Sequence, residues 1–163
     1  MYKHILIAAV TAATLVLSAP VRSYDSVVAE SYQTMFAPAK GAVVGKEIHL
    51  IPAQMFVDAV KANKPMAVLD IRTPAETKVL GMALPETLNI PLNTLFEKTN
   101  LERIPTDKPV IVFCQSGVRS VAAATALRAA GFSNVYVVKG GMKALIGYLG
   151  PKEANSPLKN ADK

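Results

Sequence analysis

The amino-acid sequence predicts an α/β fold, with a mostly parallel five-stranded sheet and helices on both of its faces. Short apolar runs alternate with helix-forming stretches between residues 48 and 148. These runs lack the polar alternation of half-exposed strands, which indicates strands buried on both faces. Helix caps and turn residues separate the two kinds of segment. Alternation of this type is typical of parallel sheets covered by crossover helices.

A strand is expected wherever an apolar run is bounded by turn residues. The five runs cover residues 48–51, 66–71, 88–90, 110–114 and 134–138. Helices are expected over residues 52–63, from residue 74, over residues 93–100 and 120–130, and from residue 140. The second of these helices has the clearest start, because Thr73 as N-cap, Pro74 at the first position and Glu76 three residues after the cap form a capping box.

The chain divides into four segments, of which the first has the layout of a signal peptide. In residues 1–23, Lys3 and His4 precede an uncharged run of 13 residues that ends in small residues. A helix needs about 20 apolar residues to cross a bilayer, so cleavage and export to the periplasm or the medium are expected, without stable membrane insertion after processing. The alternative is an uncleaved N-terminal anchor. The other three segments are a lead-in (24–45), the domain (46–150) and a flexible polar tail (151–163).

Composition and charge restrict the class of protein. Apolar residues make up 51% of the 163 residues and charged residues 18%, which is typical of a globular protein. The formal net charge is +6, but the expected domain holds 12 basic and 8 acidic residues and therefore carries only +4. It has no basic runs of the kind that bind nucleic acid, so no nucleic-acid partner is expected.

Cys114 is the only cysteine, and its position indicates a reactive thiol. A single cysteine excludes an internal disulfide, a CxxC redox pair and a cysteine-based zinc cluster. His4 and His49 have no partners at metal-binding spacing, so no metal is expected. Cys114 ends an apolar strand and precedes a glycine-containing turn and a helix, where backbone N–H groups and the helix dipole favour an anion. The alternative is a buried cysteine that acts as a small apolar residue.

The residues after the thiol suit an anion-binding loop. Gly117 permits a positive φ angle, and Ser120 can cap the following helix or offer its hydroxyl. Arg119 provides a forked cation that suits an oxyanion. The amides of residues 139–141 are expected either to touch a substrate or only to begin the last helix.

Three further residues are expected to support the loop. Asp70 lies at the end of its strand, where a carboxylate most often accepts hydrogen bonds from loop amides rather than acting in catalysis. Arg72 and Glu76 are four residues apart and are expected to pair with each other.

Three motifs resemble those of a known family. CQSGVRS, with LDIRTPAE before it and VKGGM after it, is similar to the single-domain rhodanese sulfurtransferases of the exported type, over about residues 48–148. The resemblance implies a rhodanese-like fold and makes Cys114 a nucleophile that carries sulfane sulfur as a persulfide. It also implies that the persulfide is bound by the loop residues Gln115, Ser116, Gly117, Val118, Arg119 and Ser120.

The resemblance implies the reaction partners as well. These are a small anionic sulfur donor such as thiosulfate or polysulfide, or a persulfide, and a cyanide or thiol acceptor, with a protein sulfur carrier as a further partner. Gln115 and Ser116 are neutral, which favours polysulfide or a persulfide over thiosulfate as the donor. No metal or organic cofactor is implied.

Two other functions remain open. Rhodanese-like phosphatases and arsenate reductases have a C-x5-R loop, whereas Cys114 and Arg119 form the shorter C-x4-R loop of the sulfur-transfer class. The second alternative is a non-catalytic module that binds sulfur or docks to a partner, in which Cys114 would be replaceable.

Overall fold

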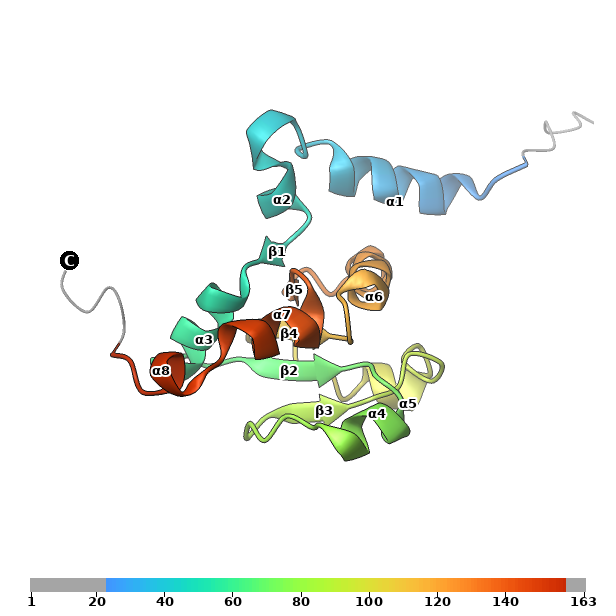
Figure 1. The fold of residues 1–163 in the computed structure, drawn as a ribbon. Helices are drawn as coiled ribbons and strands as arrows, with labels where there is room; N and C mark the ends of the chain where they lie inside the picture. Colours follow the sequence, from blue (N-terminus) through green and yellow to red (C-terminus); the bar gives the residue numbers. More distant parts are fainter. Residues whose placement is uncertain (1–22, 158–163) are drawn as a thin grey trace, which may run out of the picture.

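The computed structural model describes residues 23–157, so the expected signal peptide, apart from its last residue, and residues 158–163 lie outside the described part. A five-stranded sheet forms its centre (Figure 1), in the order β1-β5-β4-β2-β3 with all four pairings parallel. The strands are β1 (Leu50–Ile51), β2 (Ala67–Asp70), β3 (Thr87–Asn89), β4 (Val110–Phe113) and β5 (Val135–Val138). The predicted parallel sheet is confirmed, and each strand lies inside the run that predicts it or begins one residue before it.

Helices cover both faces of the sheet, as predicted. The helical elements are α1 (Ser26–Phe36), η1 (Gly41–Val43), α2 (Val44–Glu47), α3 (Ala53–Lys61), α4 (Pro74–Val79), α5 (Lys98–Leu101), α6 (Val118–Ala129), α7 (Gly141–Tyr148) and α8 (Pro151–Ala154). Helix α3 begins one residue later than expected, since Pro52 is its N-cap rather than its first helical residue.

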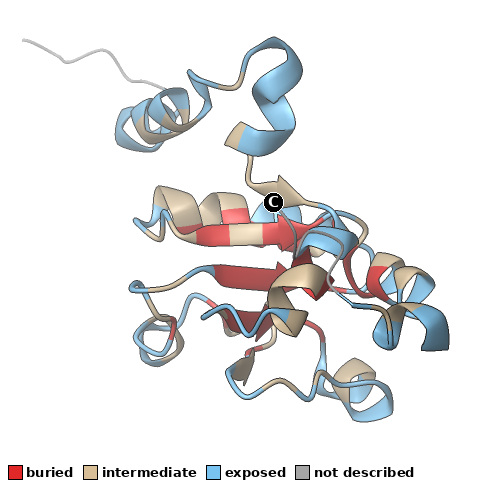
Figure 2. Cartoon of the chain, turned by 90° about the vertical axis from the view of Figure 1, so that its left-hand side faces the viewer, coloured by how far each residue is buried: buried red, intermediate tan, exposed pale blue. Residues whose placement is uncertain are grey.

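Two apolar clusters show how the sheet is buried. Successive side chains of a strand point to opposite faces. Leu69 and Val112 accordingly pack with Leu127 of α6, whereas Val68 and Ile111 pack with the helices α3 and α7. The central strands β2 and β4 are buried at every position, as Figure 2 shows in red. The continuous apolar runs of the sequence therefore reflect burial on both faces.

Parallel pairing brings two strand ends together at the edge that carries the thiol. Asp70, the last residue of β2, pairs in register with Phe113, the last residue of β4. Cys114 follows directly. The amide of Ile71 donates to the carbonyl oxygen of Phe113 at 2.9 Å and so extends this pairing to the start of the loops. The segments after β2 and β4 consequently leave the sheet side by side.

The helix predicted over residues 93–100 is displaced toward the C-terminus. Turns occupy the first part of this segment, and α5 begins only at Lys98. The hydroxyl of Thr94 donates to the carbonyl oxygen of Pro91, and the side-chain amide of Asn100 donates to that of Thr94. Such side-chain bonds to the backbone compete with helical hydrogen bonds. Leu95 is fully buried in the turn and fixes its position.

The segments before and after the domain are partly folded against it. Helix α1 in the lead-in is capped by Asp25, contacts α6 and buries none of its residues. In the segment predicted as a flexible tail, α8 is fixed by Lys61, whose ammonium group binds the Glu153 carboxylate at 3.1 Å and the Ser156 carbonyl at 3.0 Å. The folded part therefore includes α8, beyond residue 150. Among residues 23–157, no helix combines the length and the apolar character that crossing a membrane requires.

Candidate active site

Cys114 lies in a strand–turn–helix connection that directs backbone amides at its sulfur. Gly117 is the N-cap of α6 and has a φ of +88°, in the left-handed region that glycine adopts without strain. The amide nitrogen of Gly117 lies 3.1 Å from Cys114 Sγ, and that of Ser120 lies 3.4 Å away. The sulfur thus accepts two hydrogen bonds from the loop that follows it.

Two features of the Cys114 environment oppose each other. Its full burial in an apolar cluster favours a neutral thiol, whereas the two amides favour a thiolate. Burial by itself raises the pKa of the Cys114 thiol. The nearby hydroxyl and the amide of Ser120, followed by the amides of Ser116 and Gly117, outweigh that effect and lower the pKa below its ordinary value. Hydrogen bonds to the charged form favour it. The loop therefore favours ionisation of Cys114 relative to a free thiol.

The hydroxyl of Ser120 is available to this site. It is buried, and within the described residues it has no hydrogen-bond partner of regular geometry. A buried hydroxyl without a partner carries a desolvation cost. Ser120 thus contributes its amide to the sulfur and has a donor left for the thiolate or for a group bound to it.

The start of α7 is hydrogen-bonded to the cysteine loop. The amides of Met142 and Lys143 donate to the carbonyl oxygens of Cys114 and Gln115 at 2.9 and 3.0 Å. A side chain on Gly141 would collide with the carbonyl oxygen of Cys114 and would lie 2.7 Å from the nitrogen of Gly117. Only glycine permits this close approach. The VKGGM segment therefore begins the last helix and holds the cysteine loop.

Asp70 and Arg72 form a buried ion pair at the end of β2. Arg72 Nη2 lies 2.6 Å from Asp70 Oδ2, and the two residues are 2% and 0% exposed. The amide of Arg72 also donates to Asp70, as predicted for a carboxylate at a strand end, and Arg72 Nη2 donates to the carbonyl oxygen of Leu80. The predicted pairing of Arg72 with Glu76 is wrong, because the buried Asp70 carboxylate needs the guanidinium beside it.

Glu76 instead binds Arg119 of the cysteine loop. Two hydrogen bonds join them, Nη2 to Oε1 at 2.6 Å and Nη1 to Oε2 at 3.0 Å. The hydrogen bonds from Arg119, together with the amide of Thr73, lower the pKa of Glu76 to about 2, and the same pair raises the pKa of Arg119. The motif sequence gives no sign of this contact between residues 43 positions apart. The only signal is topological: α4 and α6 start at neighbouring strand ends.

The remaining loop residues form the surface above the sulfur. Gln115, Ser116 and Val118 are exposed, and Val118 is 74% exposed. Ser116, Gly117, Arg119 and Ser120 interact with the Cys114 sulfur. The hydrogen bonds of Asp70 and Arg72 stabilise the connection between β2 and α4. The outer surface of the loop itself carries no charge apart from Arg119.

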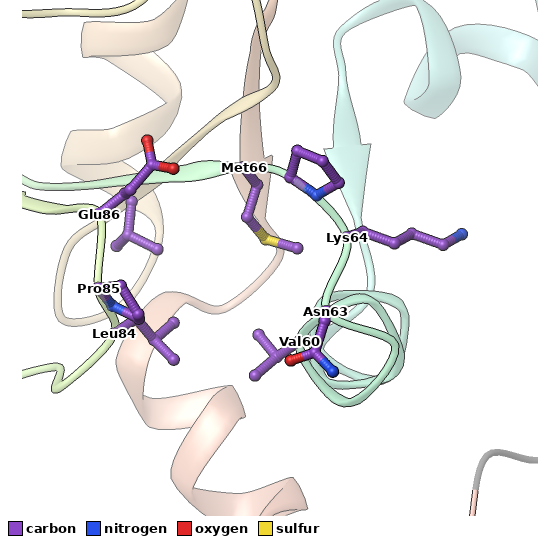
Figure 3. Close-up of a pocket in the computed structure, with 9 residues that line it drawn as sticks. Val60, Asn63, Lys64, Met66, Leu84, Pro85 and Glu86 are labelled. Carbon is purple, nitrogen blue, oxygen red and sulfur yellow. The ribbon is translucent and has the colours of Figure 1, made fainter.

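The structure also contains cavities that do not include the thiol. One of about 240 Å³ lies where β2 begins, at the opposite edge of the sheet from Cys114, and Figure 3 shows Lys64, Met66 and Glu86 around it.

Residues 23–157 contain no group of three or more His, Cys, Asp or Glu side chains that could hold a metal ion. His49 Nδ1 lies 2.8 Å from the carbonyl oxygen of Val135.

Fold and site together define an α/β protein with a buried cysteine, whose sulfur accepts two loop amides, at the carboxyl edge of a parallel sheet. Residues 53–147 match the family model of the rhodanese-like domain. The chain belongs to this family.

Comparisons with individual proteins agree with that membership. "Uncharacterized protein YqhL" of Bacillus subtilis is 43% identical over 46% of this chain and 56% of its own length. A protein named "Sulfurtransferase" of Allochromatium vinosum is 34% identical over 50% of this chain and 73% of its own length. "Putative sulfurtransferase YtwF" of Bacillus subtilis is 31% identical over 65% of this chain and 98% of its own length.

Among solved structures, a rhodanese-related protein from Thermoplasma volcanium superposes with a TM-score of 0.51 at 32% identity, and covers 61% of this chain and 91% of its own. A rhodanese-like domain protein from Staphylococcus aureus gives a TM-score of 0.52 at 28% identity, with 59% of this chain and 89% of its own covered. Both confirm the predicted fold.

Proposed function

We propose that the protein is a sulfurtransferase that carries sulfane sulfur as a persulfide on Cys114. The observation that carries this proposal is the pair of amides, from Gly117 and Ser120, that donate to the Cys114 sulfur. They favour the thiolate, which is the nucleophilic form of cysteine. The names of the Allochromatium and Bacillus relatives support the same class of reaction.

The reaction has two displacement steps. The Cys114 thiolate attacks the outer sulfur of thiosulfate, the sulfur–sulfur bond of the donor breaks, and sulfite leaves with the electron pair. A polysulfide or a persulfide donor reacts in the same way and releases a shorter polysulfide or a thiolate. The acceptor, cyanide or a thiolate, then attacks the outer sulfur of the Cys114 persulfide, which regenerates the Cys114 thiolate. Neither step needs a general base when the thiol is already ionised.

The site argues against a phosphatase or an arsenate reductase. These enzymes use the arginine of a longer loop to bind a tetrahedral oxyanion, whereas Arg119 ends a C-x4-R loop and is already bound by Glu76. A non-catalytic module is also disfavoured. Amides that favour the thiolate do not stabilise a cysteine that only fills space in the core.

We further propose that the protein acts outside the cytoplasm, after export by residues 1–23. Its partners would be a small sulfur donor and a thiol or cyanide acceptor, with a protein sulfur carrier as an additional partner. The N-terminal sequence of the mature protein tests the export proposal directly.

Intact-mass measurement tests the proposed chemistry. After exposure to thiosulfate or polysulfide, the wild-type protein should gain the mass of one sulfur atom, and a reductant should remove it. The variant Cys114→Ser should gain nothing. A phosphoaryl esterase activity that exceeds sulfur transfer would contradict the proposal.

A further inference from the structure

We infer that Glu76 determines which sulfur donors the site accepts: it holds Arg119 and neutralises its charge, which disfavours dianionic donors relative to donors of lower charge. This inference rests on the proposed sulfur transfer and deepens it. It assigns to Glu76 a positioning role that acts through Arg119 and not through contact with the reacting sulfur.

The geometry of the pair supports this assignment. The guanidinium group of Arg119 meets both carboxylate oxygens of Glu76, at 2.6 and 3.0 Å, in the fork-to-fork arrangement that is strongest for these groups. The two side chains are 35% and 31% exposed, so the pair lies partly out of solvent. Glu76 therefore occupies N–H donors of Arg119 that could otherwise bind an oxyanion of the substrate.

Glu76 is also fixed from its other side. Its Oε2 atom accepts hydrogen bonds from the amide and the hydroxyl of Thr73, at 2.9 and 3.0 Å, as part of the capping box of α4. An exposed ion pair usually contributes little to stability, because ordering two long side chains costs entropy. Here the helix cap orders the carboxylate in advance, so that Arg119 is held without that full entropic cost.

The charges around the sulfur explain the expected selectivity. The pKa of Arg119 is raised mainly by Glu76 and, to a smaller extent, by the Cys114 thiolate. Arg119 therefore lies close to the sulfur as well as to the carboxylate. With Glu76 paired, the arginine, the carboxylate and the thiolate together carry a net charge of −1. An approaching dianion is then attracted mainly by backbone dipoles, and it is disfavoured relative to a monoanion.

The variant Glu76→Gln tests the inference, since it removes the negative charge with little change in shape. With thiosulfate as the dianionic donor, we expect KM to fall about three- to tenfold and kcat to change little. With the persulfide of 2-mercaptoethanol, which carries at most one charge, we expect a smaller fall in KM. The preference for thiosulfate, expressed as a ratio of kcat/KM values, should rise and should shrink again at high salt.

Two matched variants separate charge from position. Glu86→Gln makes the same charge change at a partly exposed pair with Lys108, at the opposite edge of the sheet, and should leave the donor preference unchanged. Glu76→Asp keeps the charge but shortens the side chain, and should not raise the preference for thiosulfate. The exposed Lys139 and Lys143 of the neighbouring segment are the same in every variant, so they do not affect the comparison.

A second measurement does not depend on sulfur transfer. Sulfate, added as an unreactive dianion, should protect Cys114 from iodoacetamide at about three- to tenfold lower concentration in Glu76→Gln than in the wild type. If this protection does not change, or if kcat/KM falls by the same factor for both donors, Glu76 only supports the loop and the inference is wrong. If the wild type forms no persulfide while the protection does shift, the sulfur-transfer proposal fails and the charge-screening role of Glu76 stands.

Discussion

The amide nitrogen of Gly117 lies 3.1 Å from the sulfur of Cys114, and the positive φ of this glycine turns the loop back over the thiol. The same glycine packs against the start of α7, where Gly140 and Gly141 approach it. The thiolate, the turn and the last helix therefore depend on one another.

Gly117→Ala tests this dependence. A non-glycine residue in the left-handed region costs about 1–2 kcal/mol, and the added Cβ would lie 3.1 Å from the Gly140 nitrogen. We expect a loss of stability of about that size in urea unfolding, together with a higher pH midpoint for iodoacetamide labelling of Cys114. Gly147→Ala is the control, because Gly147 lies in α7 with open space around it. An unchanged midpoint in Gly117→Ala would show that the turn does not tune the sulfur.

Ser120→Ala should separate stability from reactivity. The buried hydroxyl has no regular hydrogen-bond partner within the described residues, so its removal should leave the free energy of unfolding unchanged or raise it. The same hydroxyl helps to lower the pKa of Cys114, so the pKa of the thiol should rise in the variant. Thermal unfolding and thiol labelling measure the two effects. A clear loss of stability with an unchanged labelling midpoint would contradict this role.

Asp70→Asn should be among the most damaging single changes. It leaves the charge of Arg72 buried and without its counter-ion, which costs about 3–5 kcal/mol in comparable buried pairs. Denaturant unfolding measures the loss. The matched variant Glu86→Gln breaks a partly exposed ion pair and should cost less than about 1 kcal/mol. Similar losses in the two variants would mean that the Asp70–Arg72 pair does not stabilise the fold.

Glu76 should make the protein sensitive to acid. Its pKa is about 2 in the folded protein, below the value of about 4.3 expected in the unfolded chain. The stabilisation is therefore complete above the unfolded value and is lost as the pH falls toward 2. The difference in unfolding free energy between wild type and Glu76→Gln should shrink over that interval. A difference that stays constant down to pH 2 would mean that the carboxylate is not stabilised by Arg119 and Thr73.

Much of the fold could be predicted from local signals. Apolar runs define the five strands because both faces of the sheet are covered, and the capping box at Thr73 is observed with both of its hydrogen bonds. The displaced start of α5 could not be predicted, because it depends on bonds from Thr94 and Asn100 that compete with a helix. The position of α8 depends on Lys61, more than 90 residues earlier in the chain.

Only the contiguous part of the candidate site can be predicted from the sequence. Sequence order places Gly117 and Ser120 in the loop after Cys114, so the approach of their amides to the sulfur follows from the turn and the helix start. Glu76 was expected to pair with Arg72 because spacing along a helix is visible in a sequence, whereas a contact between two strand ends is not. The observed pair with Arg119 needs the strand order β4-β2, which the apolar pattern does not specify.

The pH dependence of iodoacetamide labelling at Cys114 is the most direct test of the account, whose central claim is that loop amides stabilise a thiolate. The wild type should label with a midpoint below the free-thiol value of about 8.5, because the hydrogen bonds from Ser120, Ser116 and Gly117 outweigh the effect of burial. A midpoint at or above about 8.5 would show that burial dominates and that Cys114 is a structural residue.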